Sequence, residues 1–116
     1  MNDKQRERFS SALNRIGNDE ETLVMLAEMA AEDAPQLLNK MDGQVAEQQW
    51  SGYARTAHSL KGLLTTFETG DPVSEIQGLI NEARAENGNA VSAAHTKAKP
   101  KLFALVREID QLTDNA

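Results

Sequence analysis

Apolar residues recur along most of this chain at intervals of three and four. The segment from Trp50 to Phe67 shows the pattern most clearly, because its apolar positions draw one stripe along a helix. Similar stripes run through residues 19–47, 72–87 and 89–113, and the strict alternation typical of strands is absent. Each stripe must be buried against another element, so the sequence predicts an all-α fold.

Helix caps and helix breakers divide the chain into five predicted helices. Gly17 ends the first one. Asp71 and Pro72 are predicted to start a helix, as a capping carboxylate followed by proline at the first helical position. Asn87 and Gly88 are predicted to stop that helix. The predicted helices span about residues 2–16, 19–47, 50–68, 72–87 and 89–113.

The connections between the last four predicted helices are short, and short loops make successive helices run in opposite directions. The sequence therefore predicts an antiparallel up-down four-helix bundle, with the short N-terminal helix against one end. A chain of 116 residues is long enough for one core, so residues 1–116 are predicted to form a single domain. The positions predicted to be buried in the two longest helices are Leu23, Leu26, Ala30, Ala34, Leu37, Met41 and Val45, and Val91, Ala94, Ala98, Leu102, Leu105, Ile109 and Leu112.

Composition excludes several classes of function. The net charge of −6 argues against binding nucleic acid through a basic surface, and the absence of cysteine excludes disulfides and thiolate metal sites. No apolar run approaches the roughly 20 residues that span a membrane, and the N-terminus lacks the apolar region of a signal peptide. We expect a cytoplasmic monomer with no membrane insertion and no metal or cofactor of its own.

His58 lies outside the apolar stripe of its helix. At about 100° per residue it projects roughly 130° from the centre of that stripe, so we expect it to face solvent. Helical side chains lean toward the N-terminus, so a side chain at position 62 would lie over His58, and Gly62 leaves it uncovered. Lys61 leans back over His58 from three positions ahead. An accessible imidazole with a cation beside it suits the uptake and release of a phosphoryl group.

The sequence AHSLKG, from Ala57 to Gly62, followed by Phe67, resembles the histidine-containing phosphotransfer (HPt) domain of bacterial multistep phosphorelays. The resemblance covers essentially the whole chain. It implies that His58 accepts a phosphoryl group from the aspartyl phosphate of a response-regulator receiver domain and passes it to another receiver. Lys61 would stabilise the phosphoryl group, Gly62 would keep access open, and Mg²⁺ would be bound by the receiver. The protein would then be a phosphocarrier and not an enzyme with kinase activity.

Three further residues are candidates for the site. Arg55, one turn before His58, either assists transfer or contacts an acidic partner. HPt domains often place a glutamine on the following helix to hydrogen-bond the imidazole, and Gln77 and Asn81 are both candidates for this role. His95 lies in a polar part of the last predicted helix without the Lys-Gly context, and we predict no functional role for it.

Two alternatives to a phosphorelay intermediate remain open. The chain could be the phosphoacceptor domain of a chemotaxis-type or hybrid sensor kinase, phosphorylated directly by a kinase catalytic domain. It could also be a non-catalytic helical adaptor that binds response regulators and leaves His58 unused. The sequence contains no Glu-x-x-His pair of a di-iron bundle and no glycine-rich phosphate-binding loop, so di-iron chemistry and ATP binding are not predicted.

Overall fold

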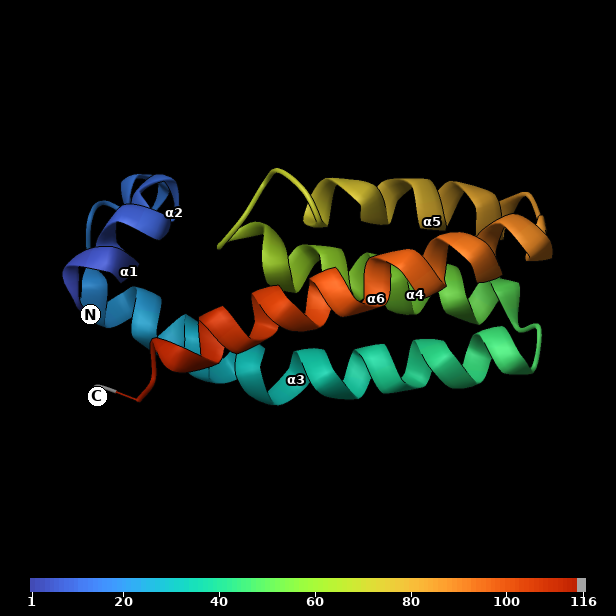
Figure 1. Ribbon diagram of the computed structural model, residues 1–116, viewed down its shortest axis with the longest axis horizontal. Helices are drawn as coiled ribbons and strands as arrows, with labels where there is room; N and C mark the ends of the chain where they lie inside the picture. The colour runs from blue at the N-terminus through green and yellow to red at the C-terminus, as the bar shows by residue number, and fades with distance from the viewer. Residues whose placement is uncertain (115–116) are drawn as a thin grey trace.

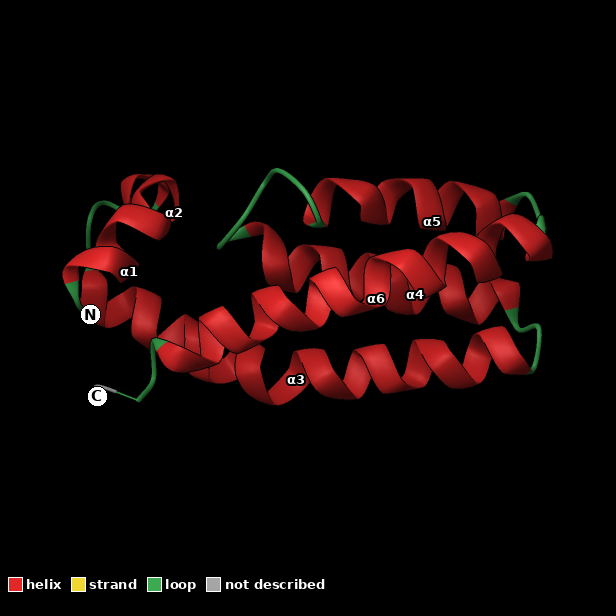
Figure 2. Ribbon diagram, viewed as in Figure 1, coloured by secondary structure: helices red, strands yellow, loops and turns green. Residues whose placement is uncertain are grey.

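The computed structural model describes residues 1–114, and all the regular secondary structure in that range is helical (Figure 1, Figure 2). The predicted all-α class is therefore confirmed. None of the helices in this range combines the length and the apolar content needed to cross a lipid bilayer. The elements are α1 (Asp3–Arg8), α2 (Ser10–Arg15), α3 (Glu20–Ala46), α4 (Trp50–Thr65), the 3₁₀ helix η1 (Val73–Glu75), α5 (Ile76–Arg84) and α6 (Gly88–Gln111).

Four helices lie side by side along the long axis of the molecule, which measures 42 × 20 × 19 Å (Figure 1). Helix α3 packs against α4 and α6, and α5 packs against the same two helices, so each of the four has two neighbours. Helix α3 is 27 residues long, and α1 and α2 lie beside its N-terminal end. This arrangement holds α4 between α3 and α5 and leaves its remaining face open to solvent.

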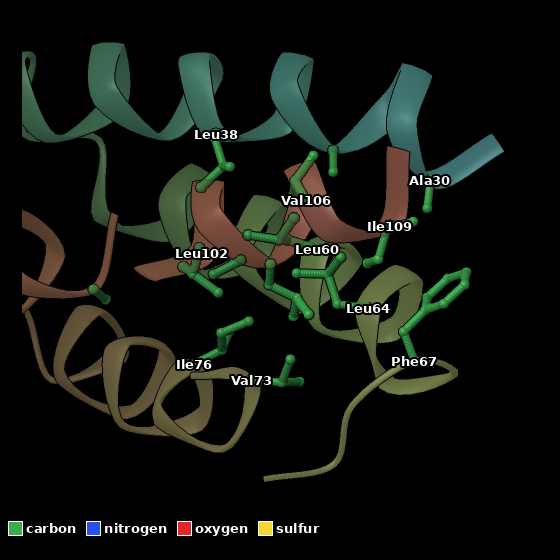
Figure 3. Close-up of a cluster of buried hydrophobic side chains, with 14 of the residues drawn as sticks. Ala30, Leu38, Leu60, Leu64, Phe67, Val73, Ile76, Leu102, Val106 and Ile109 are labelled. Atoms are coloured by element: carbon green, nitrogen blue, oxygen red, sulfur yellow. The ribbon is translucent and has the colours of Figure 1, made fainter. Parts of the chain in front are cut away.

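The core is built from aliphatic side chains of all four long helices. Figure 3 shows Leu38 of α3, Leu60 and Leu64 of α4, Ile76 of α5 and Leu102 of α6 gathered in one cluster, each no more than 1% exposed. Burying a side chain of this size is worth about 1.5–3 kcal/mol. No single helix could hide its apolar stripe alone, so this shared burial holds the helices together.

The N-terminal segment departs from the prediction. A single helix over residues 2–16 is wrong, because the chain breaks at Phe9 between α1 and α2. The Phe9 side chain is 2% exposed and meets Phe67 edge to face, with ring centroids 6.2 Å apart. A short helix is marginal by itself, so burying an aromatic ring outweighs its continuity.

The connections on either side of α5 also differ from the prediction. The helix predicted over residues 50–68 ends at Thr65, and Pro72 precedes a 3₁₀ turn instead of opening an α-helix. The peptide bond between Asp71 and Pro72 is cis. Gly88 begins α6, whereas it was predicted to stop the preceding helix. A Cβ at Gly88 would lie 2.7 Å from the ring of Trp50, so close packing requires the glycine.

The buried faces of α3 and α6 are turned slightly from the predicted stripes. Each of these helices packs against two neighbours, so its buried face is wider than one stripe. Ala27 and Leu38 are fully buried, although neither was predicted to be. The predicted core positions Leu26, Leu37, Val45 and Ala94 are half-buried, and His95 and Val106 are buried in α6.

Candidate functional site

His58 lies in the middle of α4 and is exposed to solvent, as predicted. The side chains of Arg55 and Ser59 make their hydrogen bonds within the helix and not with the imidazole. Ser59 donates to the carbonyl oxygen of Arg55 at 3.2 Å, and the Arg55 guanidinium lies 3.5 Å from the hydroxyl of Ser51. Within residues 1–114 no hydrogen bond engages the ring of His58. Its nitrogens are therefore accessible to an incoming group.

The surface beside His58 is open at Gly62. A Cβ added at this position would meet no other atom within 4 Å, so packing does not require a glycine there. Glycine inside a helix costs about 1 kcal/mol relative to alanine. A methyl group would fit, whereas a longer side chain would lean back along the helix toward His58. Glycine at this position leaves that space beside the helix open.

Lys61 is half-buried and held by the neighbouring helix. Its ammonium donates a hydrogen bond to the Gln77 side-chain oxygen at 2.8 Å, and the Gln77 amide donates to Asn81 at 2.9 Å. The sequence predicted that Gln77 or Asn81 would hydrogen-bond the imidazole. The structure instead joins them to Lys61 and to each other, because Lys61 reaches across to α5.

Helix α4 carries two cations, Arg55 and Lys61, and no acidic residue. These two side chains lie one turn on either side of His58. Arg55 also lines a hollow of about 250 Å³ between α4 and α5, together with Arg84 and Glu86. A phosphoryl group on His58 would meet positive charges on its own helix and no carboxylate there.

A second histidine site, which the sequence interpretation missed, lies between α3, α4 and α6. His95 is 6% exposed, and both of its ring nitrogens have partners. Nδ1 lies 2.9 Å from the hydroxyl of Tyr53, and Nε2 lies 2.7 Å from a carboxylate oxygen of Asp42. The other carboxylate oxygen of Asp42 accepts a hydrogen bond from Lys99 at 2.5 Å. These four residues form a closed polar cluster with no free ring nitrogen.

The electrostatics of this cluster define its hydrogen bonds. Burial alone would raise the pKa of Asp42, but hydrogen bonds from Lys99 and His95 outweigh it and hold that pKa below its ordinary value. Burial raises the pKa of the Tyr53 hydroxyl, and the charge of Asp42 raises it further, so Tyr53 stays protonated. An ionised Asp42 can only accept, so Nε2 of His95 carries a proton and donates to the carboxylate; in the neutral imidazole, Nδ1 then accepts from the Tyr53 hydroxyl.

One signal in the sequence could have revealed this cluster. His95 follows Val91 by four residues and precedes Ala98 by three, which places it on the apolar stripe of α6. Its partners Tyr53 and Asp42 lie 42 and 53 residues away in the chain, and no local pattern connects them.

Within residues 1–114, no three His, Cys, Asp or Glu side chains converge as metal ligands would. Comparison with protein families, with curated proteins and with solved structures finds no match to this chain. The functional interpretation therefore depends on the residues around His58.

Proposed function

We propose that this protein is a histidine phosphotransfer domain that carries a phosphoryl group on His58. The phosphoryl group comes from an aspartyl phosphate on one receiver domain and goes to an aspartate on another. The observation that carries the proposal is the exposed, unbonded imidazole of His58 beside the open space at Gly62. A surface histidine with no functional role would not require a glycine one turn further along the helix.

The transfer step that we propose uses these groups. The unprotonated Nε2 of the imidazole attacks phosphorus, an N–P bond forms, and the bond between phosphorus and the aspartate oxygen breaks. The receiver keeps the carboxylate and supplies the Mg²⁺ ion. Lys61, held by Gln77 at 2.8 Å, offsets the charge of the phosphoryl group, and α4 presents no carboxylate that would repel it. The reverse step on a second receiver uses the same groups.

The arrangement of the long helices is consistent with this role. We infer that α3, α4, α5 and α6 form the antiparallel up-down bundle of HPt domains, with α1 and α2 covering one end. The bundle holds α4 by contacts with α3 and α5 and presents His58 on its outer face. The protein would act as a cytoplasmic monomer, a phosphocarrier without kinase activity of its own, whose partners are receiver domains.

The direct test is phosphotransfer from purified, phosphorylated receiver domains encoded in the same genome. We expect label on the protein that is acid-labile and alkali-stable, as a phosphoramidate is. His58→Gln should carry no label, and Ser59→Ala, a change at the neighbouring exposed position, should transfer normally. Equal labelling of the His58→Gln protein would overturn the proposal. Label that requires ATP and a kinase catalytic domain, without any receiver, would instead indicate a kinase phosphoacceptor domain.

A further inference from the structure

The N-terminal half of α3 exposes two large apolar side chains. Met25 and Met29 are each 55% exposed, and they are the two large hydrophobic residues exposed in the part of the chain that the structure describes. They are four residues apart, so they are neighbours on one face of the helix. Exposed apolar side chains that adjoin one another mark contact surfaces more often than isolated ones do.

Acidic residues surround this pair. Residues 19–33 contain six Asp and Glu residues and no Lys or Arg. Helical spacing places four of them next to the methionines. We call the resulting surface the acidic methionine face; its residues, all exposed, are Glu21, Met25, Glu28, Met29, Glu32 and Asp33.

The carboxylates of this face have no cation to neutralise them. Six Arg or Lys ion pairs and one histidine–carboxylate contact join residues within 1–114, and none of them includes Glu21, Glu28, Glu32 or Asp33. By contrast, Glu20, at the edge of the face, is paired with Arg6 at 2.8 Å. The face therefore presents uncompensated negative charge around an apolar centre.

A hollow adjoins the face at its N-terminal end. It has a volume of about 540 Å³ and is lined by Met1, Thr22, Val24 and Met25 and by three glutamates, Glu20, Glu21 and Glu28. A hollow of this size can receive an apolar side chain from a partner, while Glu21 and Glu28, which take part in no ion pair, can bind cations beside it.

We propose that the acidic methionine face is the docking site of a cationic amphipathic helix from a partner protein. Its apolar side chains would lie on Met25 and Met29 and enter the hollow, and its Lys or Arg side chains would pair with the four carboxylates. Methionine is unbranched and polarisable, which suits contact with such a helix. The face extends over 13 residues of α3, about 18 Å from the first to the last, which matches roughly three turns of a partner helix.

Charge complementarity selects this occupant over others. A second copy of the chain would bring the same four carboxylates against this face, and an anionic membrane would also repel it. The proposal does not depend on phosphotransfer, because the acidic methionine face lies on α3 and His58 lies on α4. The charged residues of α4 are both cations. The two surfaces therefore attract partners of opposite charge.

The test uses a fluorescently labelled synthetic helix of about 14 residues, roughly four turns, with leucines on one face and lysines on the other. We expect saturable binding to the full chain, measured by fluorescence anisotropy, that weakens as salt is added. Met25→Gln with Met29→Gln should weaken binding at least about tenfold, because the apolar contact is lost. Glu28→Gln with Glu32→Gln should weaken it by a similar factor.

Matched controls separate this site from general attraction to an acidic protein. Glu47→Gln with Asp110→Asn removes two exposed carboxylates elsewhere and should leave binding unchanged. His58→Gln should also bind normally, so the result is independent of the phosphotransfer test. Equal weakening by the control pair, or unchanged binding after both methionines are replaced, would overturn the proposal. Self-association that disappears in the methionine variant would identify a second copy as the occupant and also overturn it.

Discussion

The two histidines of this protein lie in opposite environments. His58, on the outer face of α4, is exposed and has no hydrogen bond to the rest of the described chain. His95, on the inner face of α6, is 6% exposed and uses both ring nitrogens in hydrogen bonds. The ring nitrogens of His58 are accessible, whereas those of His95 are both held by hydrogen bonds. The same side chain is therefore suited to chemistry or to stability according to the helix face on which it lies.

Replacing each histidine in turn tests this contrast most directly. His58→Gln should abolish phosphotransfer and leave the free energy of unfolding unchanged. His95→Ala should do the reverse, lowering the free energy of unfolding by about 2–4 kcal/mol, since it removes a buried ring and leaves Tyr53 and Asp42 without a shared partner. Urea denaturation monitored by circular dichroism, with transfer assays below the unfolding midpoint, measures both effects. A collapsed fold in His58→Gln would mean that His58 is structural.

The buried cluster should also respond to pH through Asp42. Asp42→Asn should lower the free energy of unfolding by about 1–2 kcal/mol at neutral pH. The effect is modest because the Asp42 side chain is 36% exposed. The pKa of Asp42 is lower in the folded protein than its ordinary value of 3.8, so the ionised form stabilises the fold above that value. As the pH falls below about 4 this contribution is lost. The difference in the free energy of unfolding between wild type and variant should shrink there, as measured by urea denaturation at several pH values. A constant difference would show that the charge of the carboxylate does not stabilise the fold.

Substitutions of Lys61 and Gln77 should slow phosphotransfer to different extents. Lys61→Ala should slow phosphotransfer about tenfold, roughly 1.4 kcal/mol, because a cation beside the phosphoryl group is lost. Gln77→Ala should slow it less, since the ammonium remains but is no longer held. Rapid-quench measurement of the transfer rate checks both, with Lys4→Ala on the exposed surface of α1 as the control. An equal rate in Lys61→Ala and wild type would leave Lys61 as a structural partner of Gln77.

Substitutions of Gly62 should have the smallest effects on stability and on the rate of transfer. Gly62→Ala should raise the free energy of unfolding by about 1 kcal/mol and leave transfer unchanged, because a Cβ there meets no atom within 4 Å. Gly62→Gln should gain part of that stability but slow transfer, because its longer side chain leans over His58. Thermal melting and transfer rates distinguish the two variants. If Gly62→Gln transferred at the wild-type rate, the glycine would not serve access to the imidazole.

Much of the fold and part of the site were accessible from local patterns. The three-and-four spacing of apolar residues predicted the all-helical class, and α3 at Glu20–Ala46 closely matches the predicted range of 19–47. The same spacing predicted that His58 lies away from the stripe, and it is exposed. These features depend on residues within one or two turns of each other, where helical geometry alone defines the faces.

Features that involve contacts between distant segments were not predicted. The break at Phe9 depends on Phe67, and the turn before α5 does not follow the pattern of a capped helix. Lys61 was expected to lie over His58, but its hydrogen-bond partner is Gln77, 16 residues away. The sequence places His95 on the apolar stripe of α6. Its hydrogen-bond partners could not be predicted, because they are a carboxylate and a phenol from other helices.

The sequence by itself determined which segments are helical and which face of each segment is apolar, because the helical repeat relates neighbouring residues directly. Only the tertiary structure decided which polar groups meet across helices, because that depends on how the helices rotate and slide against one another. The order of residues therefore placed one imidazole in solvent, and the packing of α3, α4 and α6 gave the other its two partners.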